Sequence, residues 1–435
     1  MAKIIPFRGL RYNENKDLSA VTTPPYDIIS PAEQEEFYNL DPHSVIRLEL
    51  GKEFADDTES NNRYTRTAQD LKAWIDEQIL CFEEKPAVYL YEEIFTLPGG
   101  ETKSFKGFIT LVELAEFSKK IVLPHEETLS KAKTDRFNLM STTHANFSQI
   151  YCLYMDSEKT LTKKIAEISS RPADVSFTAK DGIIQNLWVV TDEATIADVQ
   201  AGFADKQLFI ADGHHRYETA LNFRNKMREE NPDYTQDDLF NYVMMMLVEM
   251  DDPGLVVLPT HRMVKNLEHF DENEVIEKLN GVFASEKIAV KADAAKEMEA
   301  AIEALKDTEK AFAFYTGKDY FYLLTLTDKT AMKKHIADKS DAWLGLDVAI
   351  LHTLILGDIF GIDMENMANQ KNLVYTRYAS EAADSVKSGE YQCSFLLNAT
   401  KVHEIKDVSL ANEKMPQKST YFYPKLITGL VMNKF

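Results

Sequence analysis

The fold around the candidate site is decided by the stretch Phe209-Ile-Ala-Asp-Gly-His-His-Arg-Tyr-Glu-Thr-Ala-Leu221. The apolar run at residues 207–211 predicts a buried strand that breaks at Asp212 and Gly213. From Tyr217 onward, residues recur at helical spacing, which predicts a helix. A strand, a sharp glycine turn and a helix are therefore expected to follow one another directly.

A helix start leaves backbone N–H groups without partners and carries the positive end of the helix dipole. Together these two features suit a phosphate or a carboxylate. His214, His215 and Arg216 stand at the same place and add three side-chain donors. We therefore predict an anion site at this turn. The alternative is an ordinary strand-to-helix turn with solvated polar residues.

The length of 435 residues indicates two or three domains. Beyond residue 270 the chain becomes helical and rich in Glu, Lys and Ala, so we predict an α+β domain at 1–265 and a second one at 266–435. No apolar run approaches the roughly 20 residues that span a bilayer, and the start resembles no signal peptide. Cys81, Cys152 and Cys393 form no CxxC pair. We expect buried thiols in a reducing, cytoplasmic compartment.

The net charge of −21 argues against binding of duplex nucleic acid, which needs a basic surface to neutralise the phosphate backbone. A local basic pocket can still bind a small anion. The expected partners are thus a small-molecule substrate and a nucleotide, with no nucleic acid and no membrane. The oligomeric state stays open.

Further segments of the chain carry several basic, hydroxyl or carboxylate side chains close together in the sequence. They are His125, Glu126, Lys131 and Arg136; Thr260, His261 and Arg262; Lys418, Ser419 and Thr420; and Tyr26 and Asp27 after a double proline. No glycine-rich loop precedes Lys418, so this segment is not a P-loop. The cluster at 124–136 also fits a surface helix with i,i+4 ion pairs. If the fold brings these clusters together, they form one concentrated anion site.

Periodicity predicts the remaining elements. Val45–Leu50 alternates and predicts a strand, while the two apolar runs around Pro98-Gly-Gly100 predict a hairpin. Asn241–Glu249 predicts a buried, methionine-rich strand, and a second hairpin is expected at residues 311–325. Helices alternate with these strands, which indicates an α+β fold.

Four motifs together resemble the family called domain of unknown function 1015: residues 211–221, Pro24-Pro-Tyr-Asp27, Pro259-Thr-His-Arg262 and Met415-Pro-Gln-Lys-Ser-Thr-Tyr-Phe-Tyr-Pro-Lys425. The resemblance spans nearly the whole chain. More remotely, Gly213, Arg216 and Ala220 resemble the Gly-x-x-Arg-x-x-Ala box of the ParB/sulfiredoxin superfamily, with one extra residue. Thr219 occupies the position where that box has alanine.

The remote resemblance implies a ParB/sulfiredoxin-like nucleotide-binding core with additional α/β segments and a C-terminal α+β domain. The terminal segment at 418–425 is then expected to return to the site. Members of the superfamily include CTP-using partition proteins, sulfiredoxin and kinases of free serine. The acidic charge disfavours the first, and His214 and His215 stand where sulfiredoxin chemistry needs a cysteine.

Phosphoryl transfer uses cations, a carboxylate and Mg²⁺ together. We therefore expect a phosphotransferase that uses ATP or ADP with Mg²⁺ and acts on a small hydroxylated metabolite, and the resemblance to the superfamily that includes kinases of free serine implies free serine as the best candidate. Glu126, Asp212, His214 and His215 form the expected catalytic set. The remaining residues named in the clusters above, with Gly213 and Arg216, are expected to bind phosphate or substrate.

Two other functions stay open. One is a phosphatase of a phosphorylated amino acid such as phosphoserine, which would use the same anion site without a nucleotide. The other is a non-catalytic nucleotide-binding regulator. The sequence does not choose among the three.

Overall fold

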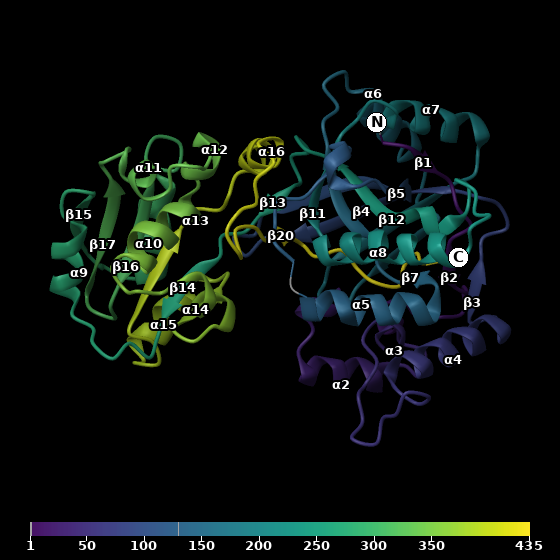
Figure 1. Ribbon diagram of the computed structural model, residues 1–435, viewed down its shortest axis with the longest axis horizontal. Helices are drawn as coiled ribbons and strands as arrows, with labels where there is room; N and C mark the ends of the chain where they lie inside the picture. Colours follow the sequence, from purple (N-terminus) through teal and green to yellow (C-terminus); the bar gives the residue numbers. More distant parts are fainter. Residues whose placement is uncertain (1, 129) are drawn as a thin grey trace. The chain divides into compact units, whose positions relative to one another are not determined.

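The computed structural model describes residues 2–128 and 130–435, without the side chains of residues 130, 131 and 368. These residues form two compact units (Figure 1). Unit 1 comprises Met1–Pro124, Thr128–Leu255 and Pro424–Phe435, and unit 2 comprises His125–Glu127 and Val256–Tyr423. Both units combine helices with a β-sheet, which confirms the α+β class. The domain boundaries predicted from the sequence, 1–265 and 266–435, remain a prediction.

A mixed nine-stranded sheet dominates the described part of unit 1. Its strand order is β6 (Val122–Leu123), β11 (Leu208–Asp212), β8 (Ile150–Tyr154), β12 (Tyr242–Glu249), β5 (Thr102–Glu113), β4 (Val88–Thr96), β10 (Ile184–Val190) and β9 (Val175–Thr178), and β1 (Ile4–Ile5) joins β5. The β6–β11 and β8–β12 pairs are parallel, and the others are antiparallel. The predicted hairpin at Pro98-Gly-Gly100 is confirmed as β4 and β5.

The helices of unit 1 are α1 (Leu18–Val21), α2 (Pro31–Leu40), α3 (Ile46–Glu49), α4 (Arg63–Asp76), α5 (Ser130–Thr143), α6 (Thr160–Ile168), α7 (Glu193–Phe203) and α8 (His214–Glu230). Residues of α5 to α8 pack on one face of the nine-stranded sheet, and α1, α3 and α4 contribute to a separate core cluster. The main core packs Leu161, Phe203 and Leu221 from three of these helices on Leu90, Ile210 and other apolar residues of the sheet. Helix α8 lies beside α5 (Figure 1).

Side chains alternate between the faces of a strand. Leu90 belongs to the main core, so Tyr91 and Glu93 of β4 lie on the opposite face with Tyr151 of β8. The Tyr151 and Phe105 rings stack there with centroids 5.9 Å apart. The final segment of the chain also belongs to unit 1, where β21 (Asn433–Lys434) pairs with β7 (Ala145–Asn146).

Unit 2 contains a six-stranded sheet within its described residues. The order is β15 (Phe283–Ala289), β17 (Tyr320–Leu326), β16 (Ala311–Tyr315), β19 (Cys393–Leu397), β14 (His261–Val264) and β18 (Leu373–Thr376). Its helices are α9 (Glu272–Leu279), α10 (Ala294–Glu303), α11 (Ala331–His335), α12 (Asp341–Leu344), α13 (Asp347–Ile350), α14 (Met364–Asn369), α15 (Ala379–Lys387) and α16 (Val402–Leu410), with a π-helical turn at Leu351–Gly357. The predicted hairpin at 311–325 is confirmed as β16 and β17. A short pair, β13 (Val256–Val257) and β20 (Phe422–Tyr423), completes the unit.

Two predictions on local structure are wrong. Val45–Leu50 contains the helix α3 and no strand, because Val45, Leu48 and Glu49 are buried at helical spacing. Cys81 is exposed in β3 (Leu80–Phe82), in which Leu80 alone is buried, whereas Cys152 and Cys393 are buried as expected. No helix in the described part of the chain has both the length and the apolar character needed to cross a bilayer.

Candidate functional site

The turn between β11 and α8 is built around Gly213. The φ angle of this residue is 95°, in the left-handed region that glycine adopts without strain. A Cβ atom at this position would lie 2.9 Å from Nη2 of Arg216. The backbone therefore favours glycine, and any side chain here would also force the Arg216 guanidinium to shift. The predicted order of strand, glycine turn and helix is confirmed.

Arg216 joins the turn to two other segments of unit 1. Its Nη2 donates to Oδ2 of Asp212 at 2.8 Å, and its Nη1 donates to the Gln149 carbonyl at 2.6 Å and to Oγ of Ser148 at 3.1 Å. The Lys425 ammonium pairs with the other Asp212 oxygen, Oδ1. One carboxylate thus faces two cations, and this group carries one positive charge in excess.

The environment of Asp212 fixes its ionisation state. Burial alone would raise the pKa of this carboxyl, but Lys425 and Arg216 outweigh burial and hold its pKa well below the usual range. Asp212 is therefore an anion at every pH where the protein is expected to work. Such a weak base is poorly suited to accept a proton, but a permanent carboxylate can hold cations.

A second arginine lies beside this group. Arg136 of α5 pairs with Oε1 of Glu49 at 3.2 Å, and its guanidinium stands 3.9 Å from the centre of the Tyr26 ring. Ser148 donates to the same Glu49 oxygen at 3.1 Å, which connects the two arginines through one carboxylate. Burial raises the pKa of Tyr26 to about 12 despite the nearby Arg136, so its hydroxyl stays protonated.

The two histidines of the turn differ in exposure. His214 is buried, and His215 is half-buried. Burial lowers the pKa of His215, although the negative charges of Asp27 and Glu218 partly offset this effect. The neutral imidazole therefore predominates at neutral pH, which is the form that accepts a proton. Asp27 is exposed close to this group.

Two cavities adjoin the cluster. One of about 30 Å³ lies between the two arginines and has room for a water molecule but not for an organic ligand. The other, of about 360 Å³, is lined by Lys425, Pro24 and residues of α2 and β10, and it falls in the size range of small-molecule sites. Lys425 thus belongs both to the charged cluster and to the wall of the larger cavity.

A buried carboxyl network lies on the sheet face opposite the main core. Glu93 is fully buried, and its Oε1 accepts from the Tyr91 hydroxyl at 2.6 Å. The Tyr91 hydroxyl also contacts the side chain of Gln185, which lines the larger cavity. The other Glu93 oxygen, Oε2, has no hydrogen-bond partner in the described residues. Burial raises the pKa of Glu93 to about 8, so it is largely protonated at neutral pH.

Several predicted site residues belong to unit 2 and cluster there. Nε2 of His125 lies 3.0 Å from Oγ1 of Thr420, and Nη2 of Arg262 donates to the Lys418 carbonyl at 3.1 Å. Arg262 is fully buried and also contacts the Thr260 carbonyl and Nε2 of His352. In these contacts Arg262 holds backbone carbonyl groups of unit 2.

Ser419 and His261, two further predicted residues of unit 2, also have structural contacts. The Ser419 hydroxyl donates to the Pro416 carbonyl at 2.6 Å, and the Ser419 carbonyl accepts from Thr400. His261 is buried, and burial lowers its pKa to about 3. Glu126 is half-buried in the short segment of unit 2 that includes His125. The side chain of Lys131 lies outside the described residues.

The structure therefore brings together, within unit 1, Asp212, Gly213, His214, His215 and Arg216 with Arg136, Tyr26 and Asp27. Sequence reasoning overlooked Glu49, because a strand was expected there, and Glu93, which has the pattern of an ordinary strand residue. Lys425 belongs to the terminal segment at 418–425, which was expected to return to the site, and its ion pair with Asp212 places this residue in the cluster of unit 1. No group of three or more His, Cys, Asp or Glu in the described residues is arranged to hold a metal ion.

Comparison with known families identifies the chain. The family described as "Protein of unknown function (DUF1015)" matches residues 4–349. The chain belongs to the DUF1015 family. The matched range includes the glycine turn and Arg262, and it ends before the Met415–Lys425 motif. No curated protein matches the chain.

Solved structures give low similarity. A variant of a free serine kinase in complex with AMP aligns at 13% identity over 72% of this chain and 88% of its own, with a TM-score of 0.34. SbnI with a C-terminal truncation, from Staphylococcus aureus, aligns at 11% identity over 74% and 86%, with a TM-score of 0.35. A conserved hypothetical protein from Pyrococcus furiosus aligns at 16% identity over 72% and 92%, with a TM-score of 0.33. The ParB/sulfiredoxin-like core stays a prediction.

Proposed function

We propose that this DUF1015 protein binds ATP or ADP at the Asp212–Arg216 turn and transfers a phosphoryl group to a small hydroxylated metabolite, with free serine as the best candidate. The observation that carries the proposal is the arrangement of Arg216 and Lys425 on the single carboxylate of Asp212 at the start of α8. Two cations, a helix N-terminus and a glycine turn are a recurrent solution for holding phosphate.

The phosphate groups would lie against the first turn of α8. Arg216 and Lys425 would exchange part of their contact with Asp212 for contacts with phosphate oxygens, and Arg136 would add charge from α5. Their side chains are already fixed by hydrogen bonds and by burial, so little conformational entropy is lost on binding. The larger cavity beside Lys425 offers space for the metabolite next to the phosphates.

The residues at the turn fit a Mg²⁺ ion that is bound jointly by protein and nucleotide. The ion usually binds one or two protein carboxylates together with phosphate oxygens, and a preformed cluster of ligands is absent from the described residues. Asp27 is the exposed carboxylate close to the turn that would share it with the nucleotide, because both oxygens of Asp212 already face Arg216 and Lys425. When bound, Mg²⁺ would neutralise charge on the phosphates.

In the reaction, the hydroxyl oxygen of the metabolite forms a bond to the terminal phosphorus. The bond from that phosphorus to the bridging oxygen breaks, and the shortened nucleotide leaves with the electron pair. His215 would take the hydroxyl proton, since its imidazole is neutral at neutral pH, whereas the permanently ionised Asp212 is too weak a base. Asp212 would instead position Arg216 and Lys425.

The test combines binding with product analysis. Phosphorus NMR would follow ATP or ADP with Mg²⁺ and a panel of L-serine, L-threonine, homoserine and glycerol. Formation of a phosphate monoester together with the shortened nucleotide is the expected result. Phosphate release from phosphoserine without nucleotide would favour a phosphatase. Nucleotide binding without any turnover, accompanied by a change in sedimentation, would favour a regulator.

A further inference from the structure

Arg262 carries a buried positive charge that no carboxylate balances. It is among the largest side chains that are fully buried in the described part of the chain. Burial lowers the pKa of Arg262 to about 10, and Tyr375 is the only described group that opposes this effect. Because a buried charge without a counter-charge is strongly unfavourable, such a residue calls for an explanation beyond packing.

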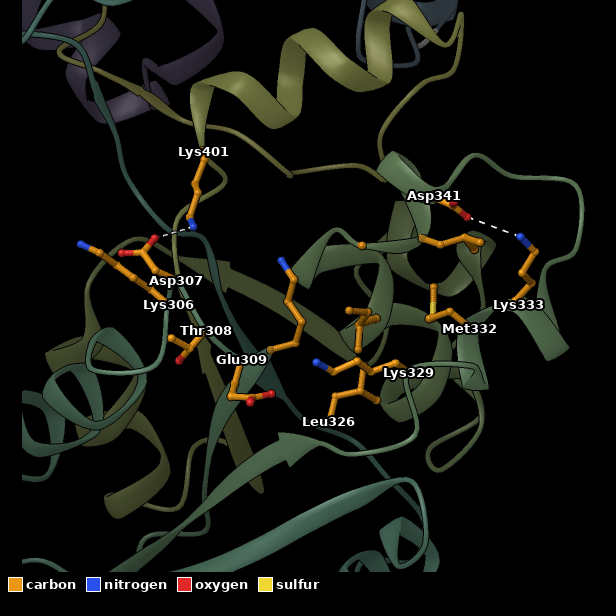
Figure 2. Close-up of a pocket in the computed structure, with 14 residues that line it drawn as sticks. Lys306, Asp307, Thr308, Glu309, Leu326, Lys329, Met332, Lys333, Asp341 and Lys401 are labelled. Atoms are coloured by element: carbon orange, nitrogen blue, oxygen red, sulfur yellow. Dashed lines mark hydrogen bonds and ion pairs between the residues drawn. The ribbon is translucent and has the colours of Figure 1, made fainter.

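Several other cations of unit 2 pair with carboxylates. Nζ of Lys401 pairs with Asp307 at 2.6 Å, and Nζ of Lys333 pairs with Asp341 at 3.4 Å (Figure 2). These pairs lie at exposed or partly exposed positions, where water also solvates the charges. Arg262 therefore lacks a counter-charge at the depth where a cation needs one most.

The Arg262 guanidinium lies on the face of the unit 2 sheet that is turned away from α10 and α15. Met263 packs in the core with residues of these two helices, so the preceding residue of β14 points to the opposite face. The strand register places Tyr375 of β18 beside Arg262, and the guanidinium stands 5.4 Å from the centre of the Tyr375 ring. The Tyr375 hydroxyl is buried and has no hydrogen-bond partner among the described residues. An unbalanced cation thus neighbours a hydroxyl without a partner.

The Arg262 guanidinium uses only part of its hydrogen-bonding capacity. Its Nε contacts Nε2 of His352 at 3.2 Å, its Nη1 contacts the Thr260 carbonyl, and its Nη2 donates to the Lys418 carbonyl at 3.1 Å. All three acceptors are neutral, since burial holds the pKa of His352 well below its ordinary value. Each terminal nitrogen of an arginine carries two hydrogens, so each has one left over for a further acceptor. A carboxylate or a phosphate accepts two parallel bonds from such a fork.

A second arginine without a carboxylate partner stands next to this group. Arg377 is partly buried, lies two positions after Tyr375 and takes part in no ion pair within the described residues. Its guanidinium stands 4.2 Å from the centre of the Tyr421 ring. Because Lys418 and Tyr421 belong to one segment, Arg262 and Arg377 contact the same stretch of chain. Two uncompensated arginines in an acidic chain concentrate small anions locally.

The Lys418 backbone covers one edge of the buried guanidinium. Lys418 is exposed, and its φ angle of 57° lies in the left-handed region, which a lysine adopts only at a cost. This conformation directs the Lys418 carbonyl to Nη2 of Arg262. A neutral oxygen therefore occupies a position where a charged oxygen would bind more strongly. Displacement of the carbonyl would also let the Lys418 backbone relax.

We propose that Arg262, Arg377 and the Tyr375 hydroxyl form a binding site for the carboxylate or phosphate group of a small metabolite, which displaces the Lys418 carbonyl. The oxyanion accepts from the terminal nitrogens of Arg262, and Arg377 adds a second charge. The site lies within unit 2 and is independent of the phosphoryl-transfer site proposed for unit 1. It gives a role to the Pro259–Arg262 motif, which the proposed function does not use.

The experiment measures binding of phosphate, pyrophosphate and succinate by calorimetry in an Arg216→Ala background, in which the turn of unit 1 lacks its arginine. At least one probe should bind with a dissociation constant on the order of 1 mM or below, and its identity shows which oxyanion the site takes. Arg377→Gln should weaken that probe about tenfold or more, and Tyr375→Phe about threefold. Lys371→Gln, which removes an exposed charge before the other end of β18, should leave it unchanged.

A second readout uses the wild-type chain and does not depend on the stability of any variant. Modification of arginines by phenylglyoxal, followed by mass spectrometry, should show that the bound probe protects Arg377 but not the exposed Arg8 of unit 1. The proposal is overturned if none of the three probes binds, if either variant of the site binds the probe as tightly as the background, or if Arg377 is not protected. Because the variants and the protected arginine belong to unit 2, these results are independent of whether unit 1 binds nucleotide.

Discussion

Lys425 forms an ion pair with Asp212, although the two residues lie 213 positions apart in the chain. The pair ties the final segment of unit 1 to the end of β11, directly before the glycine turn. Arg216 occupies the other oxygen of the same carboxylate. The positions of two cations at the start of α8 thus depend on a residue near the end of the chain.

Replacement of Lys425 by methionine should test this dependence. The substitution keeps most of the apolar stem, removes the charge and leaves Asp212 with Arg216 alone, so we expect a loss of about 1–3 kcal/mol in the free energy of unfolding. Nucleotide affinity should also fall. Lys72→Met, which removes one partner of an exposed i,i+4 pair in the same unit, should change stability by less than about 0.5 kcal/mol. Urea unfolding of both variants checks the prediction, and equal stabilities would contradict it.

Gly213→Ala should lower the stability of the fold more than the replacement of another glycine with a positive φ angle. The new Cβ would require a φ angle of 95° and would collide with the Arg216 guanidinium. Gly182→Ala is the matched control, because its φ angle is 85° but nothing lies within 4 Å of the added atom. We expect about 1 kcal/mol of destabilisation at Gly182 and about 1–3 kcal/mol more at Gly213. Thermal unfolding compares them. A Gly213 variant no less stable than the Gly182 variant would show that the turn tolerates a side chain.

Glu93→Gln should change how stability depends on pH. The pKa of Glu93 is about 8 in the folded chain and close to 4.3 when unfolded, so between these values the folded state binds more protons. Folding stability contributed by this group therefore falls as pH rises through that window. Glutamine cannot ionise. The free energy of unfolding of the variant should therefore exceed that of the wild type by on the order of a few kcal/mol at pH 8 and by little at pH 4. Parallel melting curves at pH 4 and pH 8 would refute this if the difference did not grow with pH.

The proposed role of His215 as general base predicts how kcat/KM falls at acid pH. Because burial lowers the pKa of His215 below its ordinary value near 6.5, kcat/KM should rise with pH through a midpoint below 6.5 and be level at pH 7. His215→Gln should lower kcat by about 10²-fold or more and remove this limb. His403→Gln is the control, since His403 is a histidine of unit 2 outside both proposed sites. A profile that keeps its acid limb in the His215 variant would assign the limb to another group.

The sequence predicted the centre of the site well. The apolar run before Asp212, the glycine and the helical spacing from Tyr217 are local signals, and local backbone preferences determine such a turn. The α+β class followed in the same way from the periods of strands and helices. Arg216 was recognised because three donors at one helix start are unusual for a buried core.

The rest of the site depends on contacts between distant segments, which local patterns do not encode. Nothing in the sequence around Glu49 or Glu93 distinguishes these buried carboxylates from surface residues. The alternation at Val45–Leu50 fits a strand as well as a helix, and tertiary packing selected the helix. Likewise, the donor-rich pattern at Thr260–Arg262 does not reveal that Arg262 is fully buried against backbone carbonyls of unit 2.

The central claim is that Arg216 holds nucleotide phosphate, and titration calorimetry with ATP, ADP and CTP in the presence of Mg²⁺ tests it most directly. The wild type should bind at least one nucleotide, and Arg216→Ala should weaken that binding by about tenfold to a hundredfold. Lys226→Ala, which removes a charge from an exposed position of the same helix, should bind like the wild type. Absence of binding by the wild type, or unchanged affinity in Arg216→Ala, would contradict the claim.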